Sequence, residues 1–371
     1  MKNRNVPFFD YARHWTDHRK SLIKIIDQVS SKGAFIMQEE LNNFEMKLSK
    51  YLGSKYAIGV ANATDAMEIF LQALNLNESD EIIISTHTMI ATASAIKFAG
   101  AKPIPVDIGP DFMIDPDSIE NAITKNTVGI MPTQLNGRTC DMDKIQKIAS
   151  KRGLFIVEDA AQSLGSKYKN KNAGTFGLAS DFSFYPAKVL GSIGDAGVII
   201  TNDENLYLKT YQIHDHGRDK NDGEIKIWGR NSRLDNIQAA ILLYKLDNYE
   251  NVIKRRREIA SIYNERLSSL DEIRLPPGPN SSIDHFDVYQ NYELLAKDRN
   301  QLRLFLKDHG IGTLIQWGGK AIHHYDILGF NQVCQYADTF FKECLMLPIN
   351  TFVSDDDVHY VCDKIYSFYR S

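Results

Sequence analysis

Short apolar runs recur along the first two-thirds of the chain and alternate with longer segments of helical spacing. Most runs are separated by turn residues or by stretches whose apolar positions lie three or four residues apart, as in repeated βα units. This pattern predicts an α/β domain on a largely parallel central sheet. The predicted strands are 56–60, 81–85, 102–106, 128–132, 154–158, 181–184 and 197–201.

Helical spacing before and after this region predicts further elements. Residues 22–52 are expected to be helical with a break at Gly33, and residues 234–263 to form one long helix. The Pro- and Gly-rich segment 275–282 predicts a loop. We therefore expect a large α/β domain over residues 1–245, which includes the N-terminal helical segment, and a smaller C-terminal α+β domain over residues 246–371.

Composition fits a folded enzyme of 371 residues, long enough for two domains, with 43% hydrophobic and 24% charged residues. Its 43 basic and 47 acidic residues leave a net charge of -4, so no basic excess favours a nucleic-acid partner. No signal-peptide pattern and no apolar run of roughly 20 residues is present, which predicts a cytoplasmic protein without a membrane partner. The four cysteines lack metal-ligand spacing, so we expect buried thiols and no metal.

Candidate chemistry begins with Asp159, which closes a predicted buried strand in the segment Val-Glu-Asp-Ala-Ala-Gln. Open α/β sheets place their ligands at this end of the strands. A carboxylate there is suited to a pyridinium nitrogen, whose protonation keeps the ring an electron acceptor. A helix cap or a structural hydrogen-bond acceptor is the other interpretation of an aspartate in this position.

Lys188 lies in an apolar, glycine-punctuated segment between two predicted strands. Burial disfavours the ammonium form, and the neutral amine is the form that condenses with an aldehyde. An ordinary surface lysine on a loop remains the alternative. Two further segments have polar residues at predicted helix starts, which suit a phosphate group or simple helix capping: 61–66 and 229–240.

Together and in this order, the segments resemble the DegT/DnrJ family of pyridoxal-phosphate (PLP)-dependent nucleotide-sugar aminotransferases. The resemblance runs from Gly33-Ala-Phe-Ile through Glu158-Asp-Ala-Ala-Gln and Phe182-Ser-Phe-Tyr-Pro-Ala-Lys to Leu347-Pro-Ile. It implies the aspartate-aminotransferase-like fold, which is fold type I of the PLP-dependent transferases, and a homodimer with shared active sites. Single pieces are weak evidence, but the ordered series is specific.

The resemblance also implies roles for individual residues. Lys188 would carry PLP as a Schiff base and Asp159 would face the pyridine nitrogen. The other cofactor contacts implied are Ala63, Thr64, Met89, Gln162, Ser183 and Asn231, with Asn231 reaching the phosphate of the partner subunit. Ala63 and Met89 depart from the glycine and the aromatic residue that are usual in the family, which adds a methyl group near the phosphate and replaces a stacking ring by a thioether.

The activity implied is transfer of an amino group from L-glutamate to a nucleotide-linked keto-deoxyhexose, with C4 favoured over C3. Sugar contacts are expected from Tyr185, Trp317, Lys320 and His323, although Trp317 also fits a core aromatic and Lys320 a solvated charge. A PLP-dependent sugar dehydratase and a non-catalytic PLP-binding regulator are the alternatives. A dinucleotide enzyme is disfavoured because the first βα turn lacks a glycine series.

Overall fold

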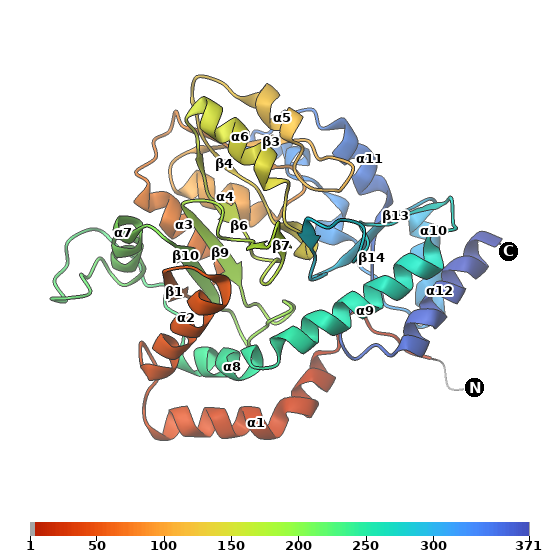
Figure 1. Ribbon diagram of the computed structural model, residues 1–371, viewed down its shortest axis with the longest axis horizontal. Coiled ribbons are helices and arrows are strands. Elements are labelled where there is room, and N and C mark those ends of the chain that lie inside the picture. The colour runs from red at the N-terminus through yellow and green to blue at the C-terminus, as the bar shows by residue number, and fades with distance from the viewer. Residues whose placement is uncertain (1–3, 371) are drawn as a thin grey trace.

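Two four-stranded sheets join into one continuous layer through the middle of the molecule (Figure 1). The computed structural model describes residues 4–370. One sheet has the order β3-β2-β4-β5 and the other β1-β10-β9-β6. A parallel bridge between Thr133 and Asp159 connects them, and β5 and β6 are two halves of one strand. The strands are β1 (Tyr56–Val60), β2 (Glu81–Ser85), β3 (Lys102–Val106), β4 (Thr127–Met131), β5 (Phe155–Ile156), β6 (Glu158–Asp159), β9 (Ala179–Ser183) and β10 (Gly197–Thr201).

The expected α/β fold with a mostly parallel sheet is confirmed. β2 pairs in parallel with β3 and β4, and β6 pairs in parallel with β9, whereas β10 runs antiparallel to both of its neighbours. Helices cover the layer on its two faces (Figure 1). The helices of the first part of the chain are α1 (Tyr11–Ser31), α2 (Glu39–Leu52), α3 (Ala63–Ala73), α4 (Ile90–Phe98), α5 (Pro116–Ala122), α6 (Met142–Arg152) and α7 (Glu204–His214).

The long helix expected over residues 234–263 is wrong as one element, because the structure divides it into α8 (Asn236–Leu246) and α9 (Tyr249–Leu267). Asn248 has φ -109° and ψ 11°, which interrupts the helical path. The next side chain, Tyr249, is buried and its hydroxyl donates to the Leu164 carbonyl at 2.8 Å. The break thus turns α9 so that its first residue packs against the segment after β6.

The rest of the chain forms a second hydrophobic core around an antiparallel sheet of order β11-β13-β14. Val6 belongs to this core and bridges Ile311, so the N-terminal segment packs with the C-terminal part. The boundary at residue 245 stays a prediction. The remaining elements are β7 (Lys167–Tyr168), β8 (Lys171–Asn172), β11 (Ile273–Arg274), β12 (His285–Phe286), β13 (Tyr292–Ala296), β14 (Cys344–Leu347), α10 (Arg299–Asp308), α11 (Gln335–Glu343), α12 (Asp355–Arg370), and the short 3-10 helices η1 (Leu135–Gly137), η2 (Gln316–Gly319), η3 (Ile322–His324) and η4 (Asp326–Leu328).

Within residues 4–370, no helix is both long enough and apolar enough to cross a membrane. Cys140, Cys334, Cys344 and Cys362 are free thiols and are buried, as the sequence predicts.

Candidate active site

Asp159 is buried at the carboxyl end of β6, where the two sheets meet. Its carboxylate accepts hydrogen bonds from the Thr92 hydroxyl at 2.6 Å and from the Ala161 backbone N–H at 3.2 Å. The Thr88 hydroxyl lies 3.4 Å from the same carboxylate. Donors of this kind stabilise the ionised form of a carboxyl group. Asp159 is therefore built to keep a negative charge at the edge of the sheet.

A second carboxyl group, Asp181 of β9, lies beside Asp159 in the register of the two strands. It is fully buried, and neither carboxyl oxygen has a hydrogen-bond partner among the described residues. Burial raises the pKa of Asp181 well above its usual value, and the Asp159 carboxylate raises it further. A second negative charge beside Asp159 is therefore disfavoured at this site. Asp181 is not among the residues predicted from the sequence, although an acid within an apolar strand is an available signal.

Lys188 occupies the loop after β9 and is partly buried. Burial lowers the pKa of its amine, while the carboxyl groups of Asp159 and Asp181 oppose this effect. The structure therefore brings Lys188 and Asp159 together, as the sequence predicts.

The loop around Lys188 is held by a residue that the sequence did not single out. The Gln290 side chain accepts from the Val189 N–H and donates to the Ala187 carbonyl, both at 2.9 Å. Arg256 of α9 in turn donates to the Gln290 carbonyl at 3.1 Å. Gln290 thus fixes the backbone on both sides of Lys188.

The predicted phosphate contacts meet at the same edge of the sheet. Ser183 ends β9 and lies beside Gly197 of β10, which in turn pairs with Val60 just before α3. A Cβ atom on Gly197 would lie 2.4 Å from the Asn62 carbonyl carbon and 2.6 Å from the Ala63 nitrogen, so only glycine permits this approach. The Asn62 side chain caps α3 by accepting from the Asp65 N–H, which leaves the earlier amides of Ala63 and Thr64 for a ligand.

Gln162 follows Asp159 by three residues and is partly buried. Its side-chain oxygen accepts from the Asn136 backbone N–H at 3.0 Å. The amide NH₂ group is therefore the part of the side chain that remains for a ligand. Met89, Tyr185 and Asn231 are exposed in the single chain; Met89 and Tyr185 are exposed by 51% and 50%.

The predicted sugar contacts from the C-terminal part are more scattered. Trp317 is partly buried and packs edge-on against His87, with ring centroids 5.5 Å apart. Lys320 is exposed, and its ammonium group lies 5.7 Å from the centre of the Tyr325 ring. No contact between these two side chains and Lys188 is present among the described residues, and their sugar roles stay predictions.

His323 is buried and both of its ring nitrogens have partners: the Thr86 hydroxyl at 2.6 Å and Asp338 at 2.9 Å. With His324 it forms a group whose ligand atoms lie within 4.8 Å of one another, close enough for a metal ion. However, His324 Nδ1 accepts the Ala321 N–H at 3.1 Å, so in the neutral ring Nε2 carries the proton and donates to Asp338 at 2.7 Å. That nitrogen has no free lone pair for a metal, and the group acts as a hydrogen-bond clamp.

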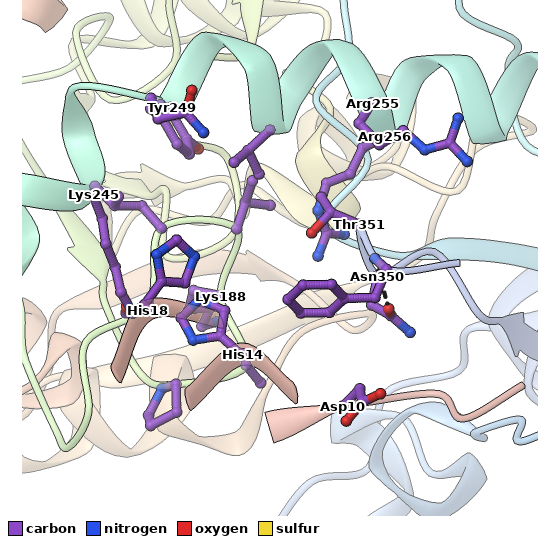
Figure 2. A pocket seen from close by; sticks show the side chains of 18 of the residues that line it. Asp10, His14, His18, Lys188, Lys245, Tyr249, Arg255, Arg256, Asn350 and Thr351 are labelled. Atoms are coloured by element: carbon purple, nitrogen blue, oxygen red, sulfur yellow. Dashed lines mark hydrogen bonds between the residues drawn. The ribbon is translucent and has the colours of Figure 1, made fainter. Parts of the chain in front are cut away.

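A cavity of about 610 Å³ lies on the other side of the Lys188 loop, between α1, α8 and α9. Figure 2 shows His14 and His18 of α1, Lys245 of α8 and Arg255 of α9 around it. Burial lowers the pKa of Lys245 to about 8 and that of His14 to about 4, so both lose charge more readily than usual. Lys188 alone of the predicted site residues lines this cavity.

A lysine with a lowered pKa lies near a carboxylate at a strand end, and the start of a nearby helix suits a phosphate group. On a sheet of this kind, the combination defines the class of fold type I aminotransferases. The chain belongs to the DegT/DnrJ/EryC1/StrS aminotransferase family, which it matches over residues 16–366. This family is PLP-dependent. The chain is a nucleotide-sugar aminotransferase by this membership and by its relatives.

Three relatives cover nearly the whole chain. It is 36% identical to the pleiotropic regulatory protein of Geobacillus stearothermophilus, over 99% of both chains. It is 35% identical to the UDP-2-acetamido-2-deoxy-3-oxo-D-glucuronate aminotransferase of Pseudomonas aeruginosa, over 96% of this chain and 98% of the relative. It is also 35% identical to the dTDP-3-amino-3,6-dideoxy-alpha-D-galactopyranose transaminase of Aneurinibacillus thermoaerophilus, over 97% and 98%.

Solved structures agree with this assignment. The crystal structure of S. venezuelae DesV in complex with a ketimine intermediate superposes with a TM-score of 0.93, at 31% identity over 99% of both chains. NtdA of Bacillus subtilis, with the bound cofactor PMP, gives a TM-score of 0.92 at 30% identity, over 100% of this chain and 87% of that one.

Proposed function

We propose that this protein uses PLP bound at Lys188 to transfer an amino group from L-glutamate to a nucleotide-linked 3-keto sugar. The observation that carries the proposal is the partly buried Lys188 close to the buried carboxylate of Asp159 at the edge of the sheet. C3 replaces the C4 position that the sequence alone favours, because one relative is named for a 3-oxo sugar and another for a 3-amino sugar.

The residues present fit this cofactor. Free amides at the start of α3 and the Ser183 hydroxyl suit a phosphate group, and the ionised Asp159 suits a ring nitrogen that carries a proton. The NH₂ group of Gln162 suits a ring oxygen. Bound PLP would supply an electron sink for the electron pair that is released when the C–H bond of the amino-acid substrate breaks.

The chain's own contribution is proton transfer and exclusion of water. Because burial favours its neutral form, the Lys188 amine would accept a proton from the substrate carbon and return it to C4′ of the cofactor, first as a base and then as an acid. Gln290 keeps the Lys188 backbone fixed while the side chain moves. Thr92 and Ala161 hold the Asp159 carboxylate in a fixed orientation by donating hydrogen bonds to it.

We include a homodimer in the proposal. Met89, Tyr185 and Asn231 are exposed in the single chain although the family resemblance assigns two of them to the cofactor and one to the sugar. The hairpin before Asn231 also exposes large apolar side chains, with Trp228 99% and Ile225 69% accessible. A second copy that covers this surface would enclose the site and contribute Asn231.

The test is direct. Purified protein should absorb visible light as a PLP enzyme, and glutamate should bleach this absorbance. Lys188→Ala should abolish both the visible band and turnover, whereas Lys209→Ala, which removes a lysine bonded to the Ala73 carbonyl, should preserve them. Full activity of the Lys188 variant would refute the proposal.

A panel of nucleotide-linked 3-keto and 4-keto sugars with glutamate, and mass detection of the amino product, distinguishes the two positions. Product from the 4-keto sugars only would overturn the C3 assignment. A non-catalytic regulator, which the name of one relative raises, predicts a visible band that glutamate does not bleach and no product from any sugar.

A further inference from the structure

A line of hydrogen bonds leads from Gln162 to a strand of the C-terminal part. The Gln162 oxygen accepts from the Asn136 N–H at 3.0 Å, and the Asn291 amide lies 3.5 Å away as a second donor. An amide whose oxygen is held by donors cannot rotate to exchange its two ends without losing these bonds. The orientation of Gln162 therefore depends on Asn136 and Asn291.

Asn136 is the central residue of this line. Its backbone is left-handed, with φ 55° in η1, a conformation that asparagine tolerates better than most residues. Its side-chain oxygen accepts from Asn291 at 2.8 Å, and its side-chain NH₂ donates to Glu293 at 2.7 Å. Both ends of the Asn136 side chain are thus engaged, which holds the turn that presents its N–H to Gln162.

Glu293 of β13 is 1% exposed and lies 3.3 Å from His87 Nε2, whose side chain is fully buried. The other nitrogen, His87 Nδ1, lies 3.0 Å from the Phe112 carbonyl and donates to it, because a carbonyl oxygen only accepts. Neither His87 Nε2 nor the other Glu293 oxygen, Oε1, has a hydrogen-bond partner among the described residues, so the Asn136 NH₂ group is the donor that holds this buried carboxyl group.

Aromatic rings seal this pair from water. The His87 ring lies 4.5 Å from Phe340, 5.2 Å from Phe341 and 5.5 Å from Trp317, measured between ring centroids. Inside such surroundings the hydrogen bond from Asn136 to Glu293 is stronger than the same bond in water.

We propose that Glu293 is a positioning residue that sets the orientation of Gln162 toward the cofactor through Asn136. The inference rests on the proposed function, because Gln162 reaches the cofactor only there. Glu293 and Asn291 come from the C-terminal part, whereas Gln162 and Asn136 lie in loops of the large sheet, so the arrangement of the two parts and the cofactor contact are linked.

The first variant is Asn136→Gly, which keeps the left-handed backbone and its N–H but removes both side-chain links. Glu293→Ala removes the other end of the same line. Each should weaken cofactor binding about five- to tenfold, as expected for one lost buried hydrogen bond, and shift the pH at which the visible absorbance changes. The double variant should lose no more than the worse single one.

Two controls separate positioning from general damage. Glu293→Gln should restore wild-type binding, since its side-chain oxygen can take the place of Oε2, the atom that accepts from Asn136. Asp107→Asn alters another carboxyl contact between the two parts, to the backbone of Tyr336 and Ala337, and should leave the absorbance titration unchanged.

Wild-type cofactor affinity and titration in Asn136→Gly would overturn the inference, as would additive losses in the double variant. Circular dichroism and thermal unfolding check that each variant folds, and Asn136→Gly decides the question if Glu293→Ala does not fold. Failure of the proposed function has a different signature: wild-type protein would show no visible band that depends on Lys188.

Discussion

Asp181 makes a prediction whose size follows from its environment. The native protein keeps the Asp181 proton because the carboxyl group is buried without donors, whereas the unfolded chain releases it above pH about 3.9. The unfolded state then binds fewer protons, so the free energy of unfolding falls as pH rises. The loss is about 1.4 kcal/mol for each pH unit until Asp181 ionises in the native state.

Asp181→Asn removes this dependence. Relative to wild type, the variant should gain free energy of unfolding as pH rises from 5 to 7, by at most about 1.4 kcal/mol per pH unit, which is the limit for one proton. Chemical denaturation of the cofactor-free proteins at pH 5, 6 and 7 measures the difference, and groups common to both proteins cancel. Asp181→Leu should show the same slope, which separates lost ionisation from hydrogen bonding by the new amide. A difference that stays constant with pH would refute an uncharged Asp181.

Three further changes test the site. Gln290→Ala should loosen the turn that carries Lys188 and lower kcat more than it raises KM for the amino donor, as steady-state kinetics would reveal. Gly197→Ala should weaken PLP binding more than tenfold in a fluorescence titration, because the new methyl group meets the start of α3. Thr92→Val removes the 2.6 Å donor to Asp159 and should lower the pH at which the visible absorbance changes, since the carboxylate loses stabilisation; an unaltered titration would contradict that contact.

The large sheet and the central pair of the site could be predicted from the chain itself. Strands β2, β3 and β10 begin and end at the residues that the sequence indicated, and the apolar runs of β2 and β10 are buried along nearly their whole length. Lys188 and Asp159 could be singled out because each is a charged residue at the end of, or beside, a segment whose other residues are mostly apolar.

Only the tertiary structure revealed the groups that hold those residues in place. Gln290, Asn136 and Glu293 are far from Lys188 and Gln162 in sequence and are ordinary polar residues in their own segments. Their importance comes from hydrogen bonds between strands and loops that the fold brings together, and no local pattern encodes a contact over more than 100 residues. Asp181 belongs to the same group, because its shifted pKa results from burial beside Asp159 on a neighbouring strand. The sequence thus pointed to Lys188 and Asp159, whose chemical roles stay predictions, and only the packing decided which groups surround and orient them, because those contacts join segments that are distant in the chain.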